Sequence, residues 1–346
     1  MSQQSVLDVQ DLYVTFHQDK KSAELVKGVS FSVAPGECLG ILGESGSGKS
    51  MTAKAMLGLL DRSFEVRGKV FFQGESLLEK DADALRRLRG SRICMVLQNP
   101  MSCFDPLYRI GAQMAETFEE HTDWSSAEIR TKSIEVLKLM KIRDPEDVLR
   151  KYPHQMSGGM LQRVMIGLAL ALKPSLIICD EPTTALDVTI QAQILKLIKD
   201  LQKEYNYTIV FITHDLGVVA NIADRVAVLY AGQIIEFANV EELFYDPRHP
   251  YTWALLSSLP QLAERNTKLF SITGTPPSLY NKIIGDPFAP RNQYCLKIDT
   301  LEEPPMFKVT DTHYAKTWLL DPRAPKTEKP EAIQNIHEKL LKAYNL

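Results

Sequence analysis

The sequence predicts an α/β fold built around a phosphate-binding loop, and two observations carry this prediction. First, the strand-like run "ECLGIL" leads into "GESGSGKS" and then into the apolar helical pattern "MTAKAMLGLL". Strand, glycine-rich loop and helix, in that order, form the context of a phosphate loop. Second, "SLIICDEP" and "TIVFITHD" are short apolar runs that end in polar residues. Such runs are typical of parallel strands that are buried on both faces.

Three strands are expected at the N-terminal end of the chain. The segment 5–16, "SVLDVQDLYVTF", has strand composition, and so do the segments 25–33 and 37–42. Pro35 and Gly36 join the last two, and this residue pair is typical of a turn.

The middle of the chain predicts helices and one hairpin. A helical pattern runs from 125 to 142, where Ser125 and Glu128 have the spacing of a capping box. A second helix is expected over 188–205, and "RVAVLYAGQIIEFA" predicts a hairpin around Ala231–Gly232. After Asn239 prolines become frequent. We therefore place a domain boundary near residue 240, with domains at 1–240 and 241–346, and expect an amphipathic helix in the final "PEAIQNIHEKLLKAYNL".

Composition excludes several classes of protein. The chain has 346 residues and a formal net charge of −3, so no global basic field points to nucleic acid. No apolar run reaches the roughly 18–20 residues that span a bilayer, and the N-terminus lacks the pattern of a secretory signal. The five cysteines are scattered. We expect them to be reduced thiols in a cytoplasmic protein, at least two of them in the core.

The segment from Gly43 to Ser50 fits the phosphate-loop pattern G-x-x-x-x-G-K-[ST]. Backbone N–H groups of the loop and of the following helix can surround a polyphosphate. Lys49 would lie against the β- and γ-phosphates, and the Ser50 hydroxyl would bind Mg²⁺. The expected phosphate-binding residues are Gly43, Glu44, Ser45, Gly46, Ser47, Gly48, Lys49, Ser50 and Met51.

Polar residues at the ends of three apolar runs are the other candidates for the chemistry. Asp180 can hold the shell of a Mg²⁺ ion, and Glu181 can polarise an attacking water as general base. The alternative is that these carboxylates cap the next helix. His214 could contact a γ-phosphate, and Gln98, which follows "ICMVL", offers an amide oxygen to Mg²⁺ or water.

The stretch "HQMSGGMLQR" precedes a long apolar helical pattern. Ser157 suits a helix N-cap, but a cap gives no reason for the two glycines that follow it. Gly158 and Gly159 would let the backbone approach a ligand closely.

In this order, over roughly residues 5–240, these motifs resemble the nucleotide-binding subunit of an ATP-binding-cassette (ABC) transporter. The Walker A motif is 43–50, the Q-loop Gln98, the signature 157–159, the end of Walker B Asp180, the D-loop "ALD" 185–187 and the switch histidine His214. The resemblance implies a mixed sheet core, an antiparallel β subdomain and a helical signature subdomain at about 104–172.

The resemblance also implies site roles. ATP would bind with Mg²⁺, the metal being held through Ser50, Gln98 and Asp180, and Glu181 and His214 would be catalytic. An aromatic before Walker A would stack on adenine, with Phe16 as the first candidate and Tyr13 as the alternative. Two cassettes would face each other head to tail, so that Ser157, Gly158, Gly159 and the D-loop Asp187 meet the ATP held by the partner subunit. ATP would then close the dimer.

The C-terminal part narrows the resemblance. "DPRHPYTWALLSSLP" looks like the extension of peptide and nickel importers, and "GTPPSLY" and "DPFAPR" are similar to the tail of oligopeptide-permease ATP-binding subunits. This implies import of oligopeptides, with dipeptides or nickel as alternatives. The implied partners are a second ABC ATPase, most simply a related heterodimer partner, two permease subunits docked on "NPMSCFDPLYRIGAQMAE", and an extracellular peptide-binding protein. The implied location is the cytoplasmic face of the plasma membrane, without nucleic acid.

One departure concerns a cofactor. Many relatives carry four tail cysteines that can hold an iron–sulfur cluster, which needs thiolate ligands. Aligning on "PFAPR" places Asp286, Asn292, Asp299 and Thr317 there, and Cys295 is the one cysteine of this tail. We therefore expect no iron–sulfur cluster.

Two other classes fit less well. Chromosome-type ABC ATPases need a long coiled coil between phosphate loop and signature, whereas only about a hundred residues without sustained heptads lie there. Translation-type proteins carry two cassettes, and a small-molecule kinase would not need Ser157–Gly159 or Asp187.

Overall fold

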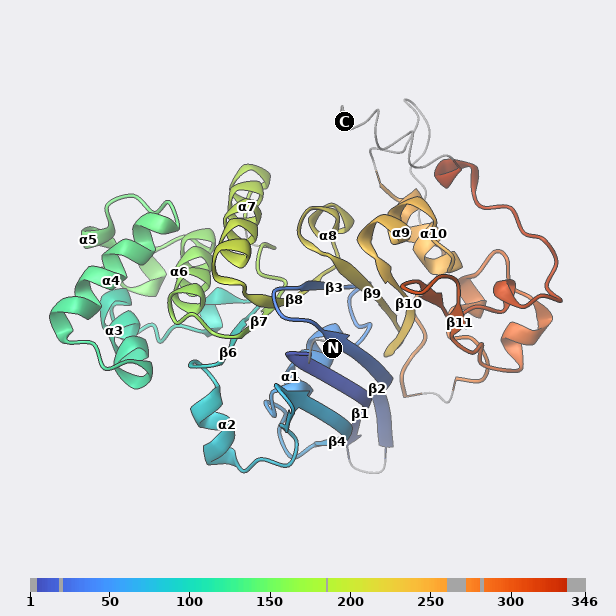
Figure 1. Cartoon of the computed structure of the whole chain (residues 1–346), viewed down its shortest axis with the longest axis horizontal. Helices are drawn as coiled ribbons and strands as arrows, with labels where there is room; N and C mark the ends of the chain where they lie inside the picture. The colour runs from blue at the N-terminus through green and yellow to red at the C-terminus, as the bar shows by residue number, and fades with distance from the viewer. Residues whose placement is uncertain (1–4, 19–20, 185, 260–271, 281–282, 335–346) are drawn as a thin grey trace. The chain divides into compact units, whose positions relative to one another are not determined.

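The computed structural model describes residues 5–18, 21–184, 186–259, 272–280 and 283–334. It divides into two compact units (Figure 1). The first comprises Met1–Leu7, Ser32–Cys38 and Phe71–Ile212, and the second Asp8–Phe31, Leu39–Val70 and Thr213–Leu346. Each unit is described on its own. No helix in the described ranges is long and apolar enough to cross a bilayer.

The first unit contains three parallel strands. β6 (Ile93–Val96) pairs with β7 (Leu176–Asp180), and β7 pairs with β8 (Thr208–Thr213). Every residue of β7 and β8 is buried, as predicted from their apolar composition. Parallel strands end at the same edge of a sheet, so Asp180 reaches the edge at which β8 also ends.

The predicted turn at Pro35–Gly36 is present. Glu37 N donates to Ala34 O at 3.2 Å, and Gly36 has φ 74°. Proline followed by a residue of positive φ defines a type II turn. The turn leads from β2 (Lys21–Val33) to β3 (Cys38–Leu42).

Helices surround the signature segment in the first unit, where Figure 1 shows α3, α4, α5 and α6 grouped in green. The capping box of Ser125 and Glu128 is confirmed at the start of α4, which ends at Leu139 rather than at 142 because Lys141 has a positive φ of 56°. Gly167 of α6 lies against α4, since a Cβ atom there would be 2.7 Å from Val136 Cγ1. The helices are α2 (Ala82–Leu88), α3 (Ile110–His121), α4 (Ser126–Leu139), α5 (Pro145–Val148), α6 (Gly158–Ala171) and α7 (Val188–Tyr205), with 3-10 turns at Pro100–Ser102 and Pro153–Gln155.

The second unit contains the predicted N-terminal strands. β1 (Leu7–Gln18), β2 and β4 (Phe64–Phe72) lie in the order β2-β1-β4. The short β5 (Glu75–Ser76) pairs with Phe71 and Phe72, and these residues belong to the first unit. β1 begins and ends two residues later than the pattern predicts, and β2 begins four residues earlier. Both differences fall at strand ends, where hydrophobic alternation carries the least information.

A second group of strands runs through the same unit. β3 is parallel to β9 (Arg225–Tyr230), β9 forms the predicted hairpin with β10 (Gln233–Asn239), and β12 (Tyr314–Ala315) joins β10 to β11 (Phe307–Lys308). Ala231 and Gly232 have φ 49° and 84°, so the hairpin turn is of the primed type that matches strand twist. The helices are α1 (Lys49–Met56), α8 (Leu216–Ile222), α9 (Val240–Tyr245) and α10 (Pro250–Ser257), with 3-10 turns at Ala289–Arg291, Lys297–Thr300, Trp318–Leu320 and Glu331–Ile333.

One hydrophobic core joins the residues on both sides of position 240. The rings of Tyr230 of β9, Tyr251 of α10 and Phe288 pack together with centroids 4.7 to 5.4 Å apart, and Phe288 meets both tyrosines edge to face. The boundary at 240 stays a prediction, and this core shows that the tail packs directly on the hairpin. The predicted terminal helix falls largely on 335–346, outside the described residues.

Candidate functional site

The phosphate loop needs glycine at two of its positions for steric reasons. A Cβ atom on Gly43 would be 2.3 Å from Leu229 O, and one on Gly48 would be 2.8 Å from Leu25 O. Gly48 also has φ 101°, a conformation that side chains other than glycine rarely adopt. Gly232 N donates to Ser47 O at 3.0 Å. The loop is therefore held between β2 and the β9–β10 hairpin.

The start of α1 suits a bound polyphosphate. Its N-cap, Gly48, provides no side-chain hydrogen bond to the first helical turn, which contains Ser50 and Met51. Across the described ranges, the buried Oγ of Ser47 has no hydrogen-bond partner. Uncapped N–H groups and an unsatisfied hydroxyl fit an anion with many acceptor oxygens.

Lys49 is fixed within the loop. Its side chain is buried, and Nζ donates to Gly43 O at 2.8 Å and to Glu44 O at 2.9 Å. Glu44 in turn contacts Tyr251 and Arg291, two residues that sequence reasoning did not identify as part of a site. No pattern in the sequence links positions so far apart.

The two candidates for adenine stacking have different surroundings. Phe16 is half-buried near the end of β1 and packs on Phe64, with ring centroids 4.9 Å apart. Tyr13 lies over Gly28, and Arg67 stacks on its ring at 5.5 Å. Arg67 already occupies a face of Tyr13, which favours Phe16, but its stacking role stays a prediction.

In the first unit, Glu181 and Gln98 lie together. Gln98 Nε2 donates to Glu181 Oε2 at 2.9 Å, and Thr184 Oγ1 reaches the same oxygen at 3.3 Å. Glu181 has φ 47°, a left-handed conformation that is uncommon for glutamate, and its N–H donates to Ile212 O at 2.9 Å. Strained backbone of this kind clusters at functional sites, and here it sets the direction of the predicted general base.

The helix-cap alternative for Asp180 and Glu181 is wrong, because α7 begins later and is capped by Asp187, whose side chain accepts from Ile190 N at 2.9 Å. Asp180 is buried at the end of β7. Ala185 of the D-loop lies outside the described residues. The Mg²⁺ roles of Ser50, Gln98 and Asp180 stay predictions.

The signature segment forms the start of α6. Ser157 is its N-cap and accepts from Met160 N at 3.2 Å, as predicted. A Cβ atom on Gly158 would have no atom within 4 Å, so packing within this chain does not require glycine there. Arg163, which sequence reasoning missed, holds the segment: its Nε donates to Gly159 O at 3.3 Å and its Nη1 to Lys141 O at 3.2 Å. Burial lowers the pKa of Arg163, while nearby Asp187 opposes that shift.

The predicted site residues therefore fall in both units. His214 directly follows β8 and is exposed, and Asp215 after it caps α8. The second unit holds the phosphate loop, Phe16 and His214, whereas Gln98, Ser157–Gly159, Asp180, Glu181 and Asp187 belong to the first.

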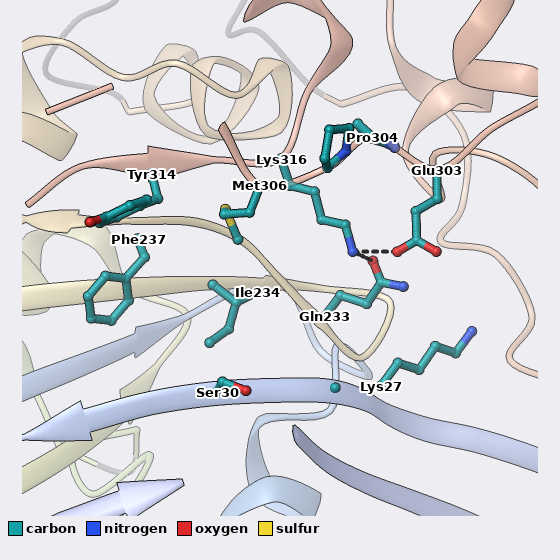
Figure 2. Close-up of a pocket in the computed structure, with 12 residues that line it drawn as sticks. Lys27, Ser30, Gln233, Ile234, Phe237, Glu303, Pro304, Met306, Tyr314 and Lys316 are labelled. Carbon is teal, nitrogen blue, oxygen red and sulfur yellow. Dashed lines mark hydrogen bonds and ion pairs between the residues drawn. The ribbon is translucent and has the colours of Figure 1, made fainter. Parts of the chain in front are cut away.

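A cavity of about 610 Å³ lies elsewhere in the second unit (Figure 2). It is lined by β2, β10 and the segment 303–316, and Figure 2 shows Lys316 extended between Gln233 and Glu303. Lys316 Nζ donates to Gln233 Oε1 at 3.0 Å and pairs with Glu303. None of the predicted site residues lines this cavity, so it is separate from the phosphate loop.

The four tail positions considered for a cluster are all buried and polar. Asp286, Asn292 and Thr317 each accept from the backbone N–H two residues further on, and Asp299 accepts from Leu296 N. Side chains of this type stabilise local turns. Burial raises the pKa of Asp286 to about 7. The expected absence of an iron–sulfur cluster stays a prediction.

The cysteines agree with the expected core role. Cys38, Cys94 and Cys179 are buried, Cys103 and Cys295 are exposed, and none of the five is in a disulfide. Burial raises the pKa of the Cys94 and Cys179 thiols to about 12, so both stay protonated and unreactive at neutral pH.

Comparison with known proteins supports the fold class that the sequence predicts. The family model "ABC transporter" matches residues 26–184, and the model "Oligopeptide/dipeptide transporter, C-terminal region" matches 235–298. The chain resembles a solved cassette from the structure "Dimeric Structure of MJ0796, a Bacterial ABC Transporter Cassette", with a TM-score of 0.62 and 28% identity over 68% of this chain and 98% of that one. The same cassette bound to ADP and Pi gives the same values.

Curated relatives match almost the whole chain. The oligopeptide transport ATP-binding protein OppD of Bacillus subtilis is 49% identical over 98% of this chain and 96% of its own length. AmiE of Streptococcus pneumoniae, also an oligopeptide transport ATP-binding protein, is 48% identical over 97% and 95%. The dipeptide transport ATP-binding protein DppD of Lactococcus lactis is 49% identical over 96% and 96%.

The fold and the phosphate loop define an ABC ATPase that hydrolyses ATP as a transporter subunit. Within that class, the chain belongs to the family of ABC transporter ATP-binding proteins that carry the oligopeptide/dipeptide C-terminal region.

Proposed function

We propose that this chain energises the uptake of oligopeptides as one ATPase subunit of a membrane importer. The observation that supports this most strongly is the 49% identity to an oligopeptide transport ATP-binding protein along nearly the entire chain, tail included. Relatives with the dipeptide name reach the same identity, so dipeptides are the second candidate. Nickel is the third, because the tail resembles nickel importers too.

In the proposed reaction, ATP supplies the phosphoanhydride bond that is hydrolysed. Loop N–H groups and Lys49 bind the phosphates, and Phe16 stacks on adenine. Ser50, Gln98 and Asp180 would hold Mg²⁺, whose charge would offset that of the phosphate oxygens. Glu181 takes the proton of the attacking water, while Gln98 and Thr184 keep its carboxylate in place through their hydrogen bonds. His214 contacts the γ-phosphate.

Ser157, Gly158, Gly159 and Asp187 act on the nucleotide of a second subunit. The open space beside Gly158 supports this, since packing in its own chain does not require a glycine there. A helix N-terminus such as that of α6 attracts an anion. ATP bound between two cassettes draws them together, and hydrolysis releases them. We expect the partner to be a related, non-identical ATPase.

The segment after Gln98 is the proposed docking surface for the permeases. Met101, Leu107 and Tyr108 are large apolar side chains with exposed fractions of 48%, 79% and 59%. Exposed apolar side chains grouped in this way are typical of protein interaction sites. The complex would hold the chain at the cytoplasmic face of the plasma membrane and would include an extracellular peptide-binding protein.

The proposal is tested by reconstituting the chain with its permeases, a partner ATPase and the binding protein in vesicles. ATP-driven uptake of labelled oligopeptides, dipeptides and Ni²⁺ is compared in the same preparation. Uptake of oligopeptides above the other two supports the proposal, whereas uptake of dipeptides or Ni²⁺ alone replaces the substrate.

A further inference from the structure

We infer that Arg291, in the C-terminal extension, is a positioning residue for the phosphate loop and acts through Glu44. Arg291 Nη1 donates to Glu44 Oε2 at 2.7 Å, and Nη2 donates to Glu44 Oε1 at 3.1 Å. The two residues are 247 positions apart in the chain. The inference deepens the ATPase function, since it concerns how this chain binds nucleotide.

Burial and contacts with residues other than Glu44 also hold the Arg291 side chain in place. It is only 4% exposed, Nε donates to Thr273 O at 3.1 Å and Nη1 also reaches Tyr230 Oη at 3.3 Å. The hydrogen bonds to Glu44 are the main reason that the pKa of Arg291 lies above its ordinary value. Two parallel N–H to oxygen bonds fix both position and direction, which a lysine ammonium cannot do.

A second residue of the extension holds the backbone of Glu44. Glu44 N donates to Tyr251 Oη at 2.9 Å, and Tyr251 is fully buried. Burial raises the pKa of the Tyr251 hydroxyl, so it stays protonated. The amide and the carboxylate of one loop residue are thus both bound by the extension.

The position of Glu44 determines where the loop holds Lys49. The carbonyl oxygens of Gly43 and Glu44 accept the two hydrogen bonds from Lys49 Nζ. Gly43 is packed tightly against β9, since a Cβ atom there would lie 2.3 Å from Leu229 O. If Glu44 loses its contacts with the extension, the two carbonyl groups that position the Lys49 ammonium shift as well. A shifted Lys49 ammonium would bind polyphosphate less well.

Five variants test this in the purified full-length chain and in the assembled importer. Arg291→Lys keeps the charge but loses the two-point hydrogen bond, Tyr251→Phe loses the hydroxyl alone, and Glu44→Gln is made both alone and combined with Arg291→Lys. Arg323→Lys is the matched control, because Arg323 also makes a two-point hydrogen bond, from Nε and Nη2 to Asp321 at 2.8 Å, but its side chain is 84% exposed.

The readouts are the dissociation constant of a fluorescent ATP analogue and the KM and kcat of ATP hydrolysis, with the melting temperature recorded for each variant. We expect Arg291→Lys to weaken nucleotide binding and raise KM about tenfold, with kcat within about twofold. Tyr251→Phe should give a smaller effect in the same direction. The Glu44 and Arg291 changes should be non-additive, and Arg323→Lys should match the unmodified chain.

An unchanged nucleotide affinity in Arg291→Lys, or additive effects of the Glu44 and Arg291 changes, would overturn the inference. A fall in melting temperature without a change in nucleotide affinity would also overturn it, because the Arg291–Glu44 pair would then only stabilise the fold. These readouts concern ATP, so they stand whichever solute the importer carries, and a failure of the oligopeptide assignment would be seen separately in the uptake assay.

Discussion

The start of α1 and the start of α6 belong to two predicted phosphate-binding segments, yet they are built in opposite ways. At α6 the side chain of Ser157 caps the helix, and at α7 Asp187 does the same. At α1 the N-cap is a glycine with positive φ and no capping side chain. A helix that lacks a cap leaves its first N–H groups for another acceptor. The difference fits the proposal that α1 binds this chain's own nucleotide and that α6 contacts the nucleotide of a partner subunit.

The contacts that support the two segments differ as well. The signature is held by residues nearby in the chain, such as Met160 and Arg163. Glu44 of the phosphate loop is held by Tyr251 and Arg291, at separations of 207 and 247 residues. The loop therefore depends on the tail, whereas the signature is supported locally.

We expect the largest effect from removing the proposed general base, a change that leaves the starts of α1 and α6 intact. Glu181→Gln should lower kcat for ATP hydrolysis by about 10²- to 10⁴-fold, because an amide cannot accept the proton from water. ATP binding should be preserved, and a stable ATP-bound dimer should accumulate. Single-turnover hydrolysis and size-exclusion chromatography with ATP measure both effects. Near-normal turnover would remove Glu181 as the base.

The next effect is a pH dependence of stability that we expect to arise from one buried carboxyl in the second unit. Asp286 is buried, and its pKa is raised to about 7 by burial first, with the nearby Asp299 adding to the shift. The unfolded chain ionises this carboxyl at lower pH than the folded chain does. The free energy of unfolding should therefore fall by at most about 4 kcal/mol as the pH rises from about 4 to about 7. Above pH 7 this contribution should stay level.

Asp286→Asn should remove this slope, since asparagine keeps an acceptor for Phe288 N but carries no charge. The measurement is chemical unfolding at several pH values, with Asp311→Asn as the control, since the Asp311 side chain is 95% exposed. An equal slope in Asp286→Asn and the unmodified chain would show that Asp286 is ionised throughout.

The sequence predicts those parts of the fold that depend on neighbouring residues. The buried strands β7 and β8, the hairpin at Ala231–Gly232 and the capping box at Ser125 are all confirmed. Each of them follows from local periodicity or turn chemistry. The site was predictable as motifs, and Ser157 is confirmed as a cap.

The geometry that joins the motifs to distant residues was not predictable. The bond from Gln98 to Glu181 and the clamp on Glu44 depend on how strands and tail pack, and neither leaves a spacing pattern in the chain. The left-handed backbone conformation of Glu181 was not predictable either, because glutamate rarely adopts a positive φ.

A third prediction tests the role of the signature in contacting another subunit. Gly158→Leu should leave the melting temperature of the isolated chain nearly unchanged, because, apart from its chain neighbours and its own helix backbone, no described residue has an atom within 4 Å of the new Cβ. ATP-driven dimer formation should weaken by at least about tenfold, because a side chain there blocks the approaching phosphate. Dimer formation is measured by light scattering in the Glu181→Gln background. Met160→Gln is the control and should form dimers normally, and equal dimer formation in both variants would contradict the proposed contact.

We expect the smallest effect from removing the Ser157 cap at the start of α6. Ser157→Ala removes the acceptor for Met160 N and should lower stability by about 1 kcal/mol, while Ser157→Gly should lower it by only a few tenths, because glycine is itself a good N-cap. Both losses should be independent of ATP in the monomer, since α6 has no ligand of its own there. The uncapped α1 behaves differently, because ATP at about 100 times its dissociation constant should stabilise the chain by about 2.7 kcal/mol. Thermal unfolding with and without ATP checks the contrast. If ATP compensated for the Ser157→Ala loss in the monomer, the signature would bind nucleotide within its own chain and the proposed exchange between subunits would be wrong.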